Sequence, residues 1–329
     1  MDTVVSLTVR LADGWDGALA GVEAVFRGLD ETFSLYREDS ELSRVARREL
    51  PLTAASSPVK DAYETAIVWR AATRGAFTPN RPDGVIDLNG IVKAMAIERS
   101  GEVLAAAGAI DWCVNAGGDV LYGGASPEES DWVTGIADPA DRGSLLASVA
   151  LFGPHRAVAT SGFSERGDHI WLRVEQERHF AQVTVFAPDI VLADVLSTAI
   201  LAAPASELDD LAKGHPVDVL AVFPDGGLVV TPRLRAQLSA GSSRRHGVTV
   251  AASRRDVAER ARSRRGLLGA LARLDEGSGF ALLPLLGPLV LQRQFGGLLG
   301  VIPTRRFSSH VHSLPLFRWR ASDDHSPSS

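Results

Sequence analysis

Residues 87–118 read DLNGIVKAMAIERSGEVLAAAGAIDWCVNAGG, and this stretch decides most about the chain. A carboxylate and an Asn-Gly turn lead into a helix, predicted over Ile91–Ala107, that carries Lys93. A strand predicted over Asp111–Asn115 follows and ends in a second turn, Asn-Ala-Gly-Gly. This layout suits a bound polyphosphate and a divalent cation better than a plain core element, although the second turn can also be purely structural.

A second informative stretch lies far downstream, where ADVLST at residues 193–198 opens another predicted helix. Asp194 and Thr198 are one helical turn apart, so their side chains share a face. Carboxylate and hydroxyl oxygens are ligands that Mg²⁺ takes in proteins. The alternative is that Asp194, an acid near a helix start, only complements the helix dipole. The two stretches together offer oxygen ligands for a hard cation and an ammonium for phosphate.

The remaining elements follow from apolar periodicity and from turn residues. Helices are predicted over Trp15–Leu29, from Asp39 onward, over Pro58–Thr73 and over Asp189–Ala202. Strands are predicted over Thr3–Leu11, Val85–Leu88, Trp132–Ala137, Leu146–Phe152, Arg156–Thr160, His169–Val174, Gln182–Ala187, Val217–Phe223 and Gly227–Thr231. Because these runs show no regular βαβ alternation, we expect an α+β fold, with a mixed sheet and flanking helices.

Composition excludes several classes of protein. The single Cys113 rules out an internal disulfide framework and a Cys-based zinc site. The start of the chain has no basic region followed by a long apolar run, so no signal peptide or lipoprotein leader is expected. No apolar run is long enough for an integral membrane segment. We therefore expect a cytoplasmic protein, and no nucleic-acid partner.

Charge divides the chain into two parts. Residues 242–329 hold 14 Arg against 6 acidic residues, although the whole chain has a net charge of −6. We place a domain boundary at this change: residues 1–241 form a single catalytic domain, and residues 242–329 a basic, low-complexity tail. Disorder is the expectation for the tail, and an arm that binds an anionic partner is the alternative.

Several motifs, in order from Met1 to about Leu238, resemble those of the ApbE family of FAD:protein FMN transferases. The central ones are DLNGIVKAMAIE at 87–98, NAGGD at 115–119 and ADVLST at 193–198. The others are MDT at 1–3, FSLYREDSELS at 33–43, GAF at 75–77, AVATSG at 157–162, HI at 169–170 and TP at 231–232. One departure stands out, since residues 171–174 read WLRV where the family commonly has a D-P-x-T-G turn.

The resemblance implies Mg²⁺-dependent transfer of FMN from the substrate FAD to a Thr or Ser hydroxyl of an acceptor protein, with AMP as the leaving group. Two other functions stay open. Water can replace the acceptor hydroxyl, which would make the protein a Mg²⁺-dependent FAD pyrophosphatase. A non-catalytic FAD-binding protein is the remaining alternative, favoured if the missing turn has disabled the chemistry.

The resemblance also implies roles for individual residues. Mg²⁺ would be held by the Gly90 carbonyl, Asp194, Thr198 and, as either a ligand or a mere hydroxyl, Ser197. His169 is the candidate general base. Residues implied in FAD binding are Met1, Tyr36, Phe77, Thr78, Asp87, Lys93, Ser161, Gly162 and Ile170. The alternatives are structural: a loop cap for Asp87, a solvated charge for Lys93, core packing for the aromatic rings and a structural histidine.

Overall fold

The computed structural model describes residues 3–10, 14–124, 132–163, 179–242, 311–313 and 317–319. Its helices are α1 Trp15–Phe33, α2 Glu41–Ala46, η1 Leu52–Ala54, α3 Ser57–Ala72, α4 Asn89–Ala106, α6 Ile190–Ala202, η2 Ala205–Glu207, α7 Leu208–Ala212 and α8 Pro232–Ser242. Its strands are β1 Thr3–Arg10, β2 Asp111–Ala116, β3 Asp119–Gly123, β4 Val133–Ala137, β5 Leu145–Ala150, β6 Ala157–Gly162, β7 Gln182–Ala187, β8 Asp218–Val222, β9 Leu228–Val230, β10 Val311–Ser313 and β11 Phe317–Trp319.

One large sheet organises these elements, in the order β10-β1-β2-β3-β6-β7-β8-β9, with β11 also paired to β1. The predicted α+β class is confirmed. Every pairing between the described strands of this sheet is antiparallel. Hairpins and returning strands account for this, because antiparallel neighbours need only short connections.

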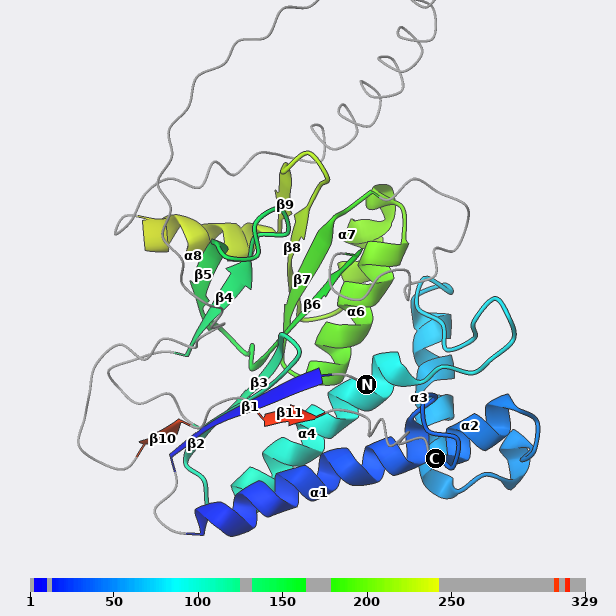
Figure 1. Ribbon diagram of the computed structural model, residues 1–329. Coiled ribbons are helices and arrows are strands. Elements are labelled where there is room, and N and C mark those ends of the chain that lie inside the picture. The colour runs from blue at the N-terminus through cyan, green and yellow to red at the C-terminus, as the bar shows by residue number, and fades with distance from the viewer. Residues whose placement is uncertain are drawn as a thin grey trace, which may run out of the picture.

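The sheet is covered on both faces (Figure 1). On one face α4 and α6 pack against the strands, and α1 packs against α4. The β4–β5 ribbon and α8 cover the other face, over the end of the sheet that holds β8. Side chains alternate between the two cores, as the strand period requires: Val114 and Leu121 face the helices, whereas Cys113 and Val120 face the ribbon side.

Trp112 packs between α4 and the β2–β3 hairpin. It lies opposite Gly123 in the β2–β3 register. A Cβ atom at Gly123 would lie 1.8 Å from the indole, and a Cβ atom at Gly101 of α4 would lie 2.3 Å from it. The indole therefore occupies the space that two missing side chains leave, and it sets the distance between the helix and the β2–β3 hairpin.

Several details of the fold differ from the sequence predictions. Val85–Leu88 is not a strand, because the surrounding proline and glycine turn leaves only an isolated bridge between Asn80 and Ile86. Strand β3 was not predicted, since its five residues directly follow a tight turn. Helix α8 was also missed, although it opens with Pro232, a residue that suits the first turn of a helix. The β4–β5 ribbon forms a separate two-stranded sheet.

Two predicted features fall largely outside the described residues. The strand predicted over His169–Val174 lies wholly outside them. In the basic tail, the structure describes only β10 and β11, which both pair antiparallel with β1. Disorder of the rest of the tail stays a prediction, as does the domain boundary.

Candidate functional site

The first part of the site is the start of α4. The Asp87 carboxylate accepts a hydrogen bond of 2.9 Å from the backbone N–H of Asn89, so this side chain shapes the turn that leads into the helix. A Cβ atom at Gly90 would lie 2.9 Å from the ring of the buried Phe77. The glycine of this motif thus allows the start of α4 to pack closely against the Phe77 ring. Lys93 follows Gly90 by three residues, or nearly one turn of the helix.

The β2–β3 hairpin supplies a buried carboxylate. Gly117 and Gly118 both have positive φ, 63° and 94°, which is the backbone that a two-residue hairpin turn of type I′ demands. The Asn115 side chain accepts a hydrogen bond of 3.0 Å from the N–H of Gly118. This turn makes Asp119 the first residue of β3 and directs it to the helix-covered face, on the same side as Leu121.

Lys93, Asp119 and Asp194 meet between the sheet and the helices. The Lys93 ammonium contacts Oδ2 of Asp119 and lies 3.5 Å from Oδ1 of Asp194. The lysine side chain is 12% exposed, and the two carboxylates are 1% and 3% exposed. The second oxygen of Asp119 accepts a hydrogen bond of 3.0 Å from the backbone N–H of Thr160. Two buried acids therefore share one half-buried cation.

Helix α6 presents Asp194 from its second turn and Thr198 from its third. Asp189 caps the helix by accepting a hydrogen bond of 2.8 Å from the N–H of Leu192. Helices α4 and α6 pack against each other, and the Lys93–Asp194 pair joins them. This pair brings a side chain from the start of α4 within 3.5 Å of a side chain on α6.

A chain of hydroxyl groups reaches from Thr198 into the core. Ser161 Oγ lies 3.1 Å from Thr198 Oγ1 and 2.8 Å from Ser197 Oγ, and Ser197 Oγ lies 3.0 Å from the carbonyl oxygen of Asp194. A carbonyl only accepts, and each hydroxyl has a single proton. All three contacts are hydrogen bonds only if Ser197 donates to the carbonyl, Ser161 donates to Ser197, and Thr198 donates to Ser161.

This direction matters for what Thr198 can bind. Its proton is committed to Ser161, so the lone pairs of Thr198 Oγ1 stay available to a cation or a donor. The buried Ser197 hydroxyl, by contrast, is engaged by its own helix and by Ser161. Of the two candidate hydroxyl ligands, Thr198 has the better arranged oxygen.

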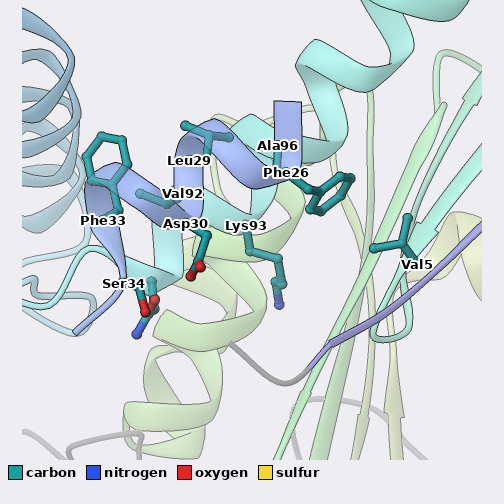
Figure 2. A pocket seen from close by; sticks show the side chains of 10 residues that line it. Val5, Phe26, Leu29, Asp30, Phe33, Ser34, Val92, Lys93 and Ala96 are labelled. Atoms are coloured by element: carbon teal, nitrogen blue, oxygen red, sulfur yellow. The ribbon is translucent and has the colours of Figure 1, made fainter. Parts of the chain in front are cut away.

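A small pocket, partly open to solvent, adjoins this cluster between α1, β1 and the start of α4 (Figure 2). Its wall is largely apolar, and four polar residues line it: Asp30, Ser34, Asn89 and Lys93. Figure 2 shows the Lys93 amine and the Asp30 carboxylate extending into the same space from α4 and α1. The pocket thus places an apolar wall beside the Lys93 ammonium.

Asp30 is an acid on the buried face of α1. Asp30 is 9% exposed. Among the described residues, the Arg37 guanidinium lies 3.9 Å from its carboxylate and pairs more closely with Asp39. Burial raises the pKa of the Asp30 carboxyl above its ordinary value, with the Ser34 hydroxyl opposing the shift.

We expect Asp30→Asn to stabilise the protein more at pH 7 than at pH 4. A raised pKa means that the folded state binds the proton more tightly than the unfolded state, so this group favours folding at low pH and loses that contribution as the pH rises through the raised value. The variant does not titrate there. Its melting temperature minus that of the wild type should therefore increase with pH. A difference that stays constant from pH 4 to pH 7 would contradict the burial argument.

The other predicted residues are placed as follows. Tyr36 is 77% exposed, and the Thr78 hydroxyl accepts a hydrogen bond from the N–H of Asn80 in a local turn. Gly162 ends β6, opposite Gln182. Of the described residues implied in FAD binding, only Lys93 lines the pocket. Met1, His169 and Ile170 lie outside the described residues, and their roles stay predictions.

The oxygen set suits magnesium better than zinc. Within the part of the chain that the structure describes, no group of three or more His, Cys, Asp or Glu side chains could hold a metal ion. Asp194 and Thr198 instead offer one carboxylate and one directed hydroxyl, with the Gly90 carbonyl as the further candidate ligand. Mg²⁺ is bound in this way, by few protein oxygens, with water and substrate phosphate completing its shell.

Sequence reasoning assigned no role to three residues that the structure brings into the site. Asp119 was visible as the last letter of the NAGGD motif, and its place after a type I′ turn was the available signal. Asn89 lies in the DLNGIVKAMAIE motif at residues 87–98. Asp30 gave no comparable signal, because Asp16, Glu23 and Glu31 lie on the same helix and only the fold reveals which acid faces inward.

Comparison with known proteins agrees with this picture. The sequence model of the ApbE family matches residues 1–82 and 78–223. The FAD:protein FMN transferase of Haemophilus influenzae is 25% identical over 160 residues, which make up 45% of this chain and 46% of that protein. The FAD:protein FMN transferase of Rhodobacter capsulatus is 30% identical over 172 residues, which make up 49% of this chain and 32% of that protein. The chain thus spans less than half the length of these curated relatives.

Solved structures share the fold. The ApbE protein of Thermotoga maritima aligns with a TM-score of 0.59 at 19% identity, over 71% of this chain and 95% of that one. The flavinyl transferase ApbE of Pseudomonas stutzeri, in its apo form, gives 0.59 at 20% identity, over 71% and 93%. At this identity the likeness concerns the fold.

A separate finding is that the described helices include none long and apolar enough to cross a membrane.

Proposed function

The chain belongs to the ApbE family, and from this premise we propose that it transfers FMN from FAD to a Thr or Ser hydroxyl of an acceptor protein, in a Mg²⁺-dependent reaction that releases AMP. The observation that carries the proposal is the meeting of α4, β3 and α6 at Lys93, Asp119 and Asp194, beside a largely apolar pocket. Such a site combines a place for a ring with charges suited to a pyrophosphate and its cation.

The chemistry would be a phosphoryl transfer. The acceptor oxygen forms a bond to the phosphorus of the FMN half, the bond from that phosphorus to the oxygen shared with AMP breaks, and the hydroxyl proton passes to a base. Bound Mg²⁺ would neutralise the pyrophosphate charge. His169 is the proposed base. Asp194 and Thr198 would hold the cation, and the pocket would orient the isoalloxazine ring so that the pyrophosphate lies beside the carboxylates.

The acceptor requirement is the direct test of this function. Purified protein is incubated with FAD and Mg²⁺, with and without a candidate acceptor that presents an exposed Thr or Ser, and AMP is measured. Release of AMP only when the acceptor is present supports the transferase. AMP in its absence would make the protein an FAD pyrophosphatase, and retained flavin without AMP would make it a binding protein.

Thr198→Val should lower the Mg²⁺-dependent rate, whereas Thr198→Ser should retain most of it. Valine has nearly the shape of threonine but no oxygen, so it removes a candidate ligand and the hydrogen bond to Ser161 together. We expect a loss of about 10- to 100-fold, the range seen when groups that orient a metal site are removed. Steady-state AMP release as a function of Mg²⁺ concentration measures it. Equal rates for the two variants would exclude the hydroxyl as a ligand.

A further inference from the structure

The arrangement of the two buried carboxylates is asymmetric. Asp119 accepts a hydrogen bond from Thr160 with one oxygen and contacts the Lys93 ammonium with the other. Asp194 lies 3.5 Å from the same ammonium, which is longer than an ordinary charged hydrogen bond. The Lys93 ammonium is therefore paired closely with Asp119 and only loosely with Asp194.

A buried pair of carboxylates needs a positive charge nearby, because burial without one is costly. In the protein without a divalent cation, Lys93 supplies that charge. A Mg²⁺ ion bound to Asp194 and Thr198 would take over this role at Asp194, and its own charge would repel the ammonium. Lys93 also lines the pocket. Its ammonium could therefore move from Asp194 to a negatively charged group of a ligand bound there.

We propose that Lys93 is the resident counter-cation of Asp194, and that a divalent cation must displace its ammonium from this carboxylate before Lys93 can pair with an anionic ligand. Asp119 is the positioning residue that keeps the ammonium within reach throughout. The proposal rests on the magnesium site of the proposed function, and it adds that cation and phosphate bind in a coupled way. Each would bind more tightly in the presence of the other.

The test compares Mn²⁺ binding, followed by the electron paramagnetic resonance of free Mn²⁺, in the wild type and three variants without nucleotide. Lys93→Met removes the competing ammonium, so its Mn²⁺ dissociation constant should fall by about tenfold or more. Asp119→Asn releases the ammonium from its anchor onto Asp194, so its dissociation constant should rise by a similar factor. Lys60→Met, at an exposed position of α3, is the control and should match the wild type.

The opposite directions of the first two variants separate this role from a merely structural one, which would weaken Mn²⁺ binding in both. Lys93→Met should also weaken the tightening of ADP binding by Mg²⁺, measured by calorimetry, and leave only the part that direct contact between the cation and the phosphate supplies. If Lys93→Met does not fold, the double variant Lys93→Met/Asp119→Asn removes both charges, and it should bind Mn²⁺ at least as tightly as the wild type.

The outcomes distinguish the two proposals. If the wild type binds Mn²⁺ and Lys93→Met binds it equally or more weakly, the counter-cation role is overturned and the magnesium site stands. Weaker binding by the double variant than by the wild type overturns the role as well. If the wild type does not bind Mn²⁺ at all, the magnesium site fails, and with it the proposed function and the exchange at Lys93.

Discussion

Asp194→Asn is expected to lower Mg²⁺-dependent AMP release by at least about 10³-fold, equivalent to roughly 4 kcal/mol of transition-state stabilisation. The amide keeps the size of the side chain but has no charge to offer a cation. Lys93 would still be paired with Asp119, so the fold should persist and the loss should be catalytic. The rate of AMP release with acceptor, FAD and saturating Mg²⁺ measures the effect.

Asp189→Asn is the matched control for this variant. It makes the same change of charge on the same helix, at an exposed residue, and asparagine caps a helix about as well as aspartate. Its rate should stay close to that of the wild type. If Asp194→Asn turned over FAD as fast as Asp189→Asn, Asp194 could not be the metal ligand.

Gly123→Ala should lower the free energy of unfolding by about 3 kcal/mol, which is in the upper part of the range for overpacking a core. The added carbon would lie 1.8 Å from the Trp112 indole, which is held from the other side by Gly101 of α4. Either the indole or the hairpin must move. Because the same hairpin carries Asp119 and the same helix carries Lys93, the ion pair should also loosen.

Gly28→Ala provides the comparison for Gly123→Ala. Gly28 is exposed on α1, and a Cβ atom there meets nothing within 4 Å. Alanine in a helix should leave stability unchanged or raise it by about 0.5–1 kcal/mol. Urea unfolding followed by circular dichroism gives both values. Equal midpoints for the two variants would show that Trp112 is not tightly packed against Gly123.

Local signals in the sequence predicted much of the secondary structure. Periodic apolar residues placed α1, α4 and α6 within a few residues of their ends. The residue after the predicted end of α4 at Ala107 is Gly108, and its φ of 83° explains why the helix stops there, since a glycine takes this conformation without strain. Signals that depend on partners were weaker: Val85–Leu88 looked like a strand but has no neighbour along which to pair, and β3 is short.

The site could be predicted only in part, for a related reason. Asp194, Thr198 and Lys93 carry recognisable motifs, so they were found one at a time. Their geometry depends on contacts between residues far apart in the chain, and nothing local encodes such contacts. The pairing of Lys93 with Asp119, the inward position of Asp30 and the hydroxyl chain through Ser161 all belong to this class.

The measurement that tests the central claim most directly is the intact mass of an acceptor protein after incubation with this chain, FAD and Mg²⁺. We predict a mass increase equal to one covalently attached FMN, located on a Thr or Ser, formed together with AMP and absent when Asp194→Asn replaces the wild type. An acceptor of unchanged mass, in a reaction where the wild type nevertheless splits FAD into FMN and AMP, would contradict the account.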